Sequence, residues 1–290
     1  LGADRYLFVF ECVGDNNYTL VYKQAMGVQE GGYAMIYDIN TGDVDKDGMK
    51  EIVFVGTDEM YNPAGEVTYA DGWIRLYELQ RNASSNRPID NSYTEVLHDY
   101  DLYNMGNFNP GAYSLDIAYH ATADYPTIFA GHSFGVALFE TDADNSLVRK
   151  ANYLTDNVTR VVKADNTDGD SWMEFIAGSG NFIFVFEQNQ TKNPVDNIYD
   201  RVWLSKELDE YVTDLRIGDS NRNGRKEILA TSLMGYLYGF EWIANVTASE
   251  SASLSSVSVG MSSEGQSFNL WCFDLPPDRK WNIFQRRYEI

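Results

Sequence analysis

A short apolar segment that ends in an aromatic residue and a glutamate recurs five times along the chain. The copies read LFVFE, IRLYE, VALFE, IFVFE and LYGFE, at residues 7–11, 74–78, 136–140, 183–187 and 237–241. Their starts are 67, 62, 47 and 54 residues apart. Repeats of about 40–50 residues that are built from short strands are typical of β-propellers, in which each repeat forms one four-stranded blade. The pattern therefore predicts an all-β propeller with the recurring segment as the third strand of each blade.

The other strands of each blade can be aligned on these copies. We expect first strands at residues 34–39, 114–118, 158–163 and 212–217. Second strands are expected at 52–55, 128–130, 175–177 and 228–231, and fourth strands at 19–23, 93–97, 147–151 and 201–204. Apolar and β-branched residues dominate these segments, and Gly or Asn precedes most third strands, as hairpin turns require.

The chain begins directly with a third strand, so two inner strands of that blade have to come from elsewhere. We expect the C-terminal segments 267–273 and 281–288 to supply them, with 245–263 as a weak outer strand and connection. This arrangement gives one domain, 1–290, of five antiparallel blades closed by the C-terminal segment. The expected blade units are 1–32 plus 264–290, 33–112, 113–157, 158–210 and 211–263. The alternative is a fragment of a seven-bladed propeller.

An acidic loop precedes the second strand in three units, reading GDVDKDGMKEI in its best copy at residues 42–52. Alternating Asp or Asn side chains followed by a glutamate can supply the oxygen ligands that Ca²⁺ prefers. The candidate ligands of the first loop are Asp43, Asp45, Asp47, Glu51 and the Met49 carbonyl. Those of the second are Asn166, Asp168, Asp170, Glu174 and the Trp172 carbonyl. Those of the third are Asp219, Asn221, Asn223, Glu227 and the Arg225 carbonyl. Up to three calcium ions are expected.

Two other interpretations of these loops are possible. An EF-hand needs a glutamate at position twelve of its loop, where this chain has Phe54, Ala177 and Ala230, followed by strand-like residues. Acidic turns without metal are the simpler alternative, because Asp, Asn and Gly favour turns for local reasons. If metal binds, the affinity should follow ligand charge, so the first loop should bind most tightly and the third most weakly. No metal is expected in the remaining full unit, 113–157, where the corresponding loop, around residues 120–127, is shorter and lacks these ligands.

The loops GDVDKDGMKEI and GDSNRNGRKEI resemble the FG-GAP (VCBS-type) repeats of integrin-alpha-like β-propellers. The resemblance covers about residues 33–242. It implies a calcium ion held between the first two strands of a blade, usually with a structural role, and a function in binding or adhesion at the cell surface. Phe134 and Gly135 give an FG pair, but no Gly-Ala-Pro follows. No particular family member's partner can therefore be transferred to this chain.

Charge and cysteines narrow the range of partners. The net charge of −21 disfavours nucleic acid and anionic membranes, because no basic patch offsets it. No apolar run approaches the roughly 18 residues of a membrane span, and no signal peptide is visible, so we expect a mature chain or part of a longer one. Cys12 and Cys272 form no zinc motif. Five sequons permit a glycosylated, extracellular or cell-surface protein: Asn17, Asn82, Asn157, Asn189 and Asn245.

No catalytic motif stands out. The chain lacks GxSxG, HExxH and phosphate-binding glycine loops. The histidines His98, His120 and His132 lack recognisable partners, although His120 and His132 flank one hairpin and could approach each other. Acid pairs such as Asp99 with Asp101, or Asp142 with Asp144, are most simply loop and turn residues.

Exposed aromatic side chains are expected to cluster in the second and third units, where the segments 58–71 and 98–113 lie between strands. They are Tyr61, Tyr69, Trp73, Tyr100, Tyr103, Tyr113 and Tyr125. A ligand could stack on them, whereas packing between blades is the simpler alternative for any one of them. Three hypotheses follow: a non-enzymatic extracellular module that binds protein or carbohydrate, a glycosidase or polysaccharide lyase on the same scaffold, and a structural domain of a larger surface protein.

Overall fold

The computed structural model describes residues 2–3, 6–26, 32–61, 64, 67–80, 92–99, 111–119, 125–143, 146–170, 172–188, 199–241, 269–272 and 284–289. Every regular element in these ranges is a β-strand, and every pairing is antiparallel. The predicted all-β class is confirmed, and each predicted first, second, third and fourth strand coincides with an observed one.

The strands form five sheets, in which successive strands of the chain are neighbours except at β18, which is followed in space by β20 and then by β19. The first sheet contains β1 (Gly2–Ala3), β2 (Tyr6–Gly14) and β3 (Asn17–Ala25). The second contains β4 (Gly32–Gly42), β5 (Glu51–Tyr61), β6 (Val67–Gln80) and β7 (Ser92–Asp99). The third contains β8 (Ala112–Ala118), β9 (Thr127–His132), β10 (Gly135–Ala143) and β11 (Ser146–Leu154).

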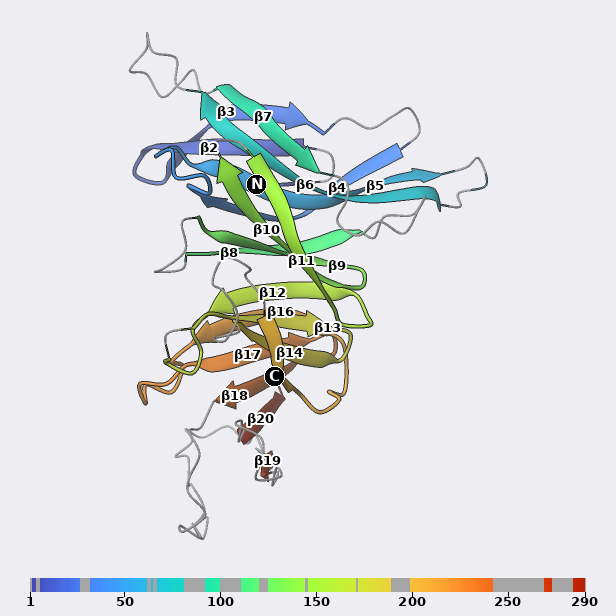
Figure 1. Cartoon of the computed structure of the whole chain (residues 1–290), viewed down its shortest axis with the longest axis vertical. Coiled ribbons are helices and arrows are strands. Elements are labelled where there is room, and N and C mark those ends of the chain that lie inside the picture. The colour runs from blue at the N-terminus through green and yellow to red at the C-terminus, as the bar shows by residue number, and fades with distance from the viewer. Residues whose placement is uncertain are drawn as a thin grey trace.

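The fourth sheet contains β12 (Thr159–Asp165), β13 (Glu174–Ser179), β14 (Phe182–Gln188) and β15 (Tyr199–Leu204). The fifth contains β16 (Val212–Gly218), β17 (Glu227–Ser232), β18 (Tyr236–Glu241), β20 (Phe284–Glu289) and β19 (Asn269–Cys272), in that spatial order. The sheets follow one another along the long axis of the molecule (Figure 1), and the first strands β4, β8, β12 and β16 contact one another in turn.

The C-terminal strands belong to the last sheet and not to the first. Strand β20 pairs with β18, for example Leu237 with Tyr288, and β19 pairs with β20. The expected completion of the first blade by segments 267–273 and 281–288 is therefore wrong for the residues that the structure describes. The physical reason is the open edge of β18, whose backbone N–H and C=O groups would otherwise lack strand partners. Residues 245–263 lie outside the described ranges.

The hydrophobic core lies between neighbouring sheets. All six residues of β9 and all six of β13 are buried, because each strand is covered on both faces. Between the third and fourth sheets, Phe175 stacks on Phe186 with ring centroids 4.6 Å apart, and it also contacts Phe129, Tyr153 and Tyr199. Stacked and edge-on aromatic contacts of this kind stabilise the interface beyond simple burial.

Acidic side chains also join the sheets through hydrogen bonds. Asp38 on β4 accepts a hydrogen bond from the Leu115 amide on β8, at 2.9 Å. Asp116 on β8 accepts one from the Ala164 amide on β12, also at 2.9 Å. Burial raises the pKa of Asp116, whereas the hydrogen bond from Ala164 opposes that shift. Part of the strong acidity of the sequence therefore fixes the second sheet to the third and the third sheet to the fourth.

The expected loop at residues 58–71 is mostly strand, because β5 continues to Tyr61 and β6 begins at Val67. Trp73, expected as an exposed aromatic residue, is fully buried. Its indole N–H donates to Asp58 at 2.9 Å, and its ring lies edge-on to Phe54. Tyr113 and Tyr125 are half-buried. The side chains of Tyr61, Tyr69, Tyr100 and Tyr103 lie outside the described part of the structure.

His132, at the end of β9, is fully buried and satisfied by its own hairpin. Its Nδ1 accepts a hydrogen bond from the Phe134 amide at 3.3 Å, which leaves Nε2 to donate to Asn152 Oδ1 at 2.8 Å. Burial lowers the pKa of His132 to about 4, and the charge of Arg149 acts in the same direction. This histidine is a neutral core residue. The side chains of His98 and His120 lie outside the described residues.

Acidification is expected to destabilise the protein through His132. The unfolded chain binds a proton below the ordinary histidine pKa of about 6.5, whereas the folded chain binds it only near pH 4. Stability is therefore present above pH 6.5 and is lost as the pH falls towards 4, by about 3 kcal/mol in total. Urea unfolding across this range should show the loss in wild type and a smaller loss in His132→Gln. Equal slopes would contradict the assignment.

Candidate metal centre

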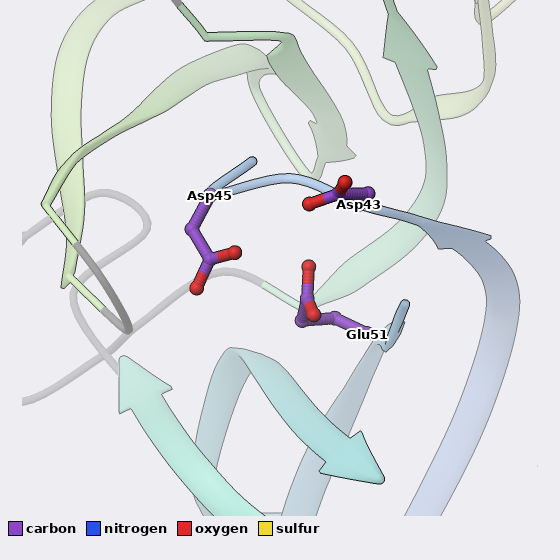
Figure 2. Close-up of side chains that lie close together, drawn as sticks. All are labelled: Asp43, Asp45 and Glu51. Atoms are coloured by element: carbon purple, nitrogen blue, oxygen red, sulfur yellow. The ribbon is translucent and has the colours of Figure 1, made fainter. Parts of the chain in front are cut away.

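The first acidic loop joins β4 to β5 and brings three of its predicted ligands together. Carboxylate oxygens of Asp43, Asp45 and Glu51 lie within 4.8 Å of one another. Figure 2 shows the three side chains facing a common space. Glu51 is the first residue of β5 and is fully buried, and Asp45 is also buried. Asp43 is half-buried, so the hairpin holds an acidic group at the base of the loop that is largely shielded from water.

Backbone amides of the loop donate hydrogen bonds to the carboxylates of the same loop. The Val44 amide donates to Glu51 Oε2 at 2.7 Å, and the Met49 amide donates to Asp47 Oδ1 at 2.6 Å. Lys46 and Gly48 have positive φ values of 59° and 89°, and the left-handed conformation at Gly48 suits a residue without a Cβ. Asp47 is exposed and lies outside the group of three.

Two oxygen atoms of this cluster are orphaned. Asp43 Oδ1 and Glu51 Oε1 are buried and have no hydrogen-bond partner. Burial raises the pKa of Glu51 to about 7, and the charges of Asp45 and Asp43 add to the shift. Buried acceptors normally find a donor, so an orphaned pair calls for an explanation. A hard cation would satisfy both oxygens and favour the ionised carboxylates, and the donor set consists of the oxygens that Ca²⁺ requires. The residues therefore fit calcium.

The second loop, between β12 and β13, repeats this geometry. The Thr167 amide donates to Glu174 Oε2 at 2.5 Å, and the Trp172 amide donates to Asp170 Oδ1 at 2.6 Å. Gly169, with φ of 82°, takes the place of Lys46. Glu174 is fully buried, its Oε1 has no hydrogen-bond partner, and burial raises its pKa to about 8. These residues also fit a cation.

The group of acids at the second loop includes a residue that the loop pattern did not reveal. Oxygens of Asp168, Glu174 and Glu187 lie within 4.8 Å of one another. Glu187 stands on β14, directly opposite Glu174 on β13. The signal was present in the sequence as the glutamate that ends each recurring third strand, but only the strand register shows which residue it faces. Asp170 is exposed, and the Asn166 amide group donates to its carbonyl oxygen.

The third loop, between β16 and β17, has the same backbone conformation as the first loop, but the oxygens of its glutamate both have hydrogen-bond partners. Arg222 and Gly224 have φ values of 60° and 85°, and the Ser220 amide donates to Glu227 Oε2 at 2.6 Å. Asn221 Nδ2, however, donates to Glu227 Oε1.

The acid on the neighbouring strand of this sheet is also satisfied by the chain itself. Asn223 Nδ2 donates to Glu241 at 3.0–3.1 Å, and Arg225 lies 3.6 Å from the same carboxylate. Asp219 is exposed and accepts the Asn223 and Gly224 amides, each at 2.9 Å. The third loop therefore fits a cation less well than the other two.

The third sheet, β8–β11, has no acidic loop, and its recurring glutamate is paired with side chains of the chain. At the position equivalent to Glu51, β9 has Thr127, which faces Glu140 on β10 and donates to it at 3.3 Å. Lys150 lies 3.9 Å from the same carboxylate. No group of carboxylates that could hold a metal is found here among the described residues. Residues 120–124 of this connection lie outside them.

No protein-family model matches the chain, and no curated protein matches its sequence. The function must therefore be inferred from the geometry above. The part of the chain that the structure describes contains no helix long and apolar enough to cross a membrane. The pairs Asp99 with Asp101 and Asp142 with Asp144 lie outside the described side chains. Cys12 is a free, exposed cysteine, and the sequon residues Asn17 and Asn157 are exposed.

Proposed function

We propose that the chain is a calcium-stabilised β-propeller that serves as an extracellular binding or adhesion module. The observation that carries the proposal is the buried glutamate at the base of two separate loops, Glu51 and Glu174, each with an orphaned oxygen that faces further acids. Two independent copies of this costly arrangement argue against chance, because a buried carboxylate without a partner destabilises a fold. A bound Ca²⁺ removes that cost.

Two further features support a propeller. The third and fourth sheets are four-stranded meanders, and the first strands of neighbouring sheets lie side by side, as the inner strands of adjacent blades do. The resemblance of the loops to FG-GAP repeats also supports calcium at the same hairpin of the three units that carry an acidic loop. In such a protein the ion stabilises the scaffold, and the ligand binds elsewhere on its surface.

The exposed aromatic side chains favour a ligand with apolar faces, such as a sugar ring or an aromatic protein side chain. Tyr37 on β4 is 42% exposed, and its ring lies 5.1 Å from that of Tyr113 on β8. Paired tyrosines present flat apolar faces together with hydroxyl groups. The net charge of −21 disfavours nucleic acid as the ligand. We therefore propose a protein or carbohydrate partner at the cell surface.

A calorimetric titration with CaCl₂ tests the metal part of the proposal. We expect two tighter sites and a weaker third one, because the acids of the Asp219 loop are already paired with Asn221, Asn223 and Arg225. Glu51→Gln should abolish one of the tighter sites and leave the other. MgCl₂ should bind more weakly, because Mg²⁺ demands a stricter octahedral geometry. Absence of calcium binding, or tightest binding at the Asp219 loop, would contradict the proposal.

The binding role is tested by exposing the calcium-loaded chain to immobilised glycans. We expect retention that Tyr37→Ala weakens about tenfold, since loss of one stacking ring costs on the order of 1 kcal/mol. The exposed Tyr211, which lies just before β16, gives a matched control in Tyr211→Ala. Failure of every glycan to bind would exclude carbohydrate and leave a protein ligand.

A further inference from the structure

The glutamates that end the third strands lie opposite the glutamates of the loops. The register pairs Glu51 with Glu78, Glu174 with Glu187, and Glu227 with Glu241. Like charges directly opposite each other destabilise an antiparallel pair. A sequence that places two acids together in three separate sheets needs a positive or hydrogen-donating group at each of them.

The fifth sheet supplies that group from the chain itself, and the third sheet, which has no opposed pair of glutamates, also pairs its recurring glutamate with donors of the chain. In the fifth sheet, Glu241 is bound by the amides of Asn221 and Asn223 and lies near Arg225. In the third sheet, the residue facing Glu140 is a threonine that donates to it, and Lys150 lies close by. In these two sheets the recurring glutamate is therefore paired with donors of the chain.

In the fourth sheet a third acid joins the opposed pair. Here Glu187 on β14 lies among acids, with Asp168 and Glu174 within 4.8 Å. Glu174, a member of this group, is fully buried, and its Oε1 has no hydrogen-bond partner. The group draws its oxygens from the loop, from β13 and from β14. Oxygens that come from three different segments are typical of a cation site, whereas an acidic turn without metal would use only residues of the turn.

We propose that Glu187 is a direct ligand of the cation in the second loop, contributed by the neighbouring strand. This inference rests on the proposed calcium function. With Glu187 the second site has four carboxylates, Asp168, Asp170, Glu174 and Glu187, and equals the first loop in ligand charge. The ion then joins β14 to the β12–β13 hairpin, and the second site binds Ca²⁺ about as tightly as the first.

Trp172 allows the second site to be observed alone. Its carbonyl is a predicted ligand, so the indole belongs to a residue of the site itself, whereas the other two loops have Met49 and Arg225 at this position. Tb³⁺ replaces Ca²⁺ in oxygen cages, and its luminescence is sensitised by an adjacent indole. Terbium titration of the full chain, with excitation selective for tryptophan, should report this site. Trp172→Phe should abolish the signal and thereby identify its source.

The decisive variant is Glu187→Gln, with Glu140→Gln as the matched control at the same strand position of the unit without a loop. We expect Glu187→Gln to weaken terbium binding, and calcium competition for it, about tenfold or more, because affinity follows ligand charge. Glu140→Gln should leave both unchanged. In EDTA, Glu187→Gln should melt no lower than wild type, because it removes a like-charge pair. A merely structural glutamate would instead lower the melting temperature without changing the affinity.

The outcomes separate the two proposals. If wild type binds neither calcium nor terbium, the proposed function fails, and this inference fails with it. If wild type binds both and Glu187→Gln binds them equally well, only the role of Glu187 is overturned. Asp168→Asn serves as the positive control, since it removes a ligand of the loop itself.

Discussion

Removal of calcium with EDTA is expected to lower the melting temperature of this protein by about 10 °C or more. A ligand that binds only the folded state stabilises it by about 4 kcal/mol when present at a thousand times its Kd. For a domain of about 150–250 residues, each kcal/mol of unfolding free energy shifts the melting temperature by about 2–4 °C, and we expect a similar effect here. Without the ion, Glu51 and Glu174 remain buried beside other acids, which adds to the loss. Differential scanning calorimetry in EDTA and in excess CaCl₂ measures the difference.

The matched control is the double variant Glu51→Gln and Glu174→Gln. Glutamine keeps an oxygen that can accept the Val44 and Thr167 amides but removes the charge that a cation requires. We expect its melting curve to be nearly insensitive to calcium. A wild-type curve that does not change on chelation would show that the loops are acidic turns without a structural ion.

Phe175→Ala is expected to lower the free energy of unfolding by about 3–5 kcal/mol. The ring is fully buried between the third and fourth sheets and contacts four other aromatic rings. Its loss leaves a cavity that these large neighbours cannot fill without leaving their preferred geometry. Urea unfolding monitored by circular dichroism in the presence of calcium measures the change.

Phe10→Ala provides the comparison, because Phe10 is of the same residue type but is 47% exposed on β2. We expect a loss of less than about 1 kcal/mol there, since little apolar surface is returned to water. Equal losses at the two positions would mean that the interface between the third and fourth sheets is not part of the stable core.

The sequence predicted the strands well because each carries its own local signal. The second strands, such as the one containing Phe175, are short and almost wholly apolar, and their loops align in register. The converging loop acids were also predictable, because Asp43, Asp45 and Glu51 are close in sequence. Local patterns such as these survive in any arrangement of the sheets.

Long-range placement could not be predicted in the same way. The C-terminal strand β20 could pair with any open edge, and its alternating residues do not distinguish β18 from the first sheet. The neighbour of Glu174 depends on the register between β13 and β14, which only the folded sheet defines. Trp73 was expected on the surface because its partner Asp58 is 15 residues away and carries no signal of burial.

The third loop has a wider consequence for this architecture. Arg222 has a positive φ, as Lys46 does in the first loop, and a backbone amide donates a hydrogen bond to Glu227 as one does to Glu51. In the third loop, however, the side chains of asparagines and an arginine contact the glutamates. The backbone conformation of the hairpin is thus the same whether or not side-chain donors pair with its buried glutamate. If calcium occupies the first two loops as proposed, side-chain donors replace it in the third without a change in the backbone of the hairpin. The dependence of this fold on metal could then differ from one hairpin to the next.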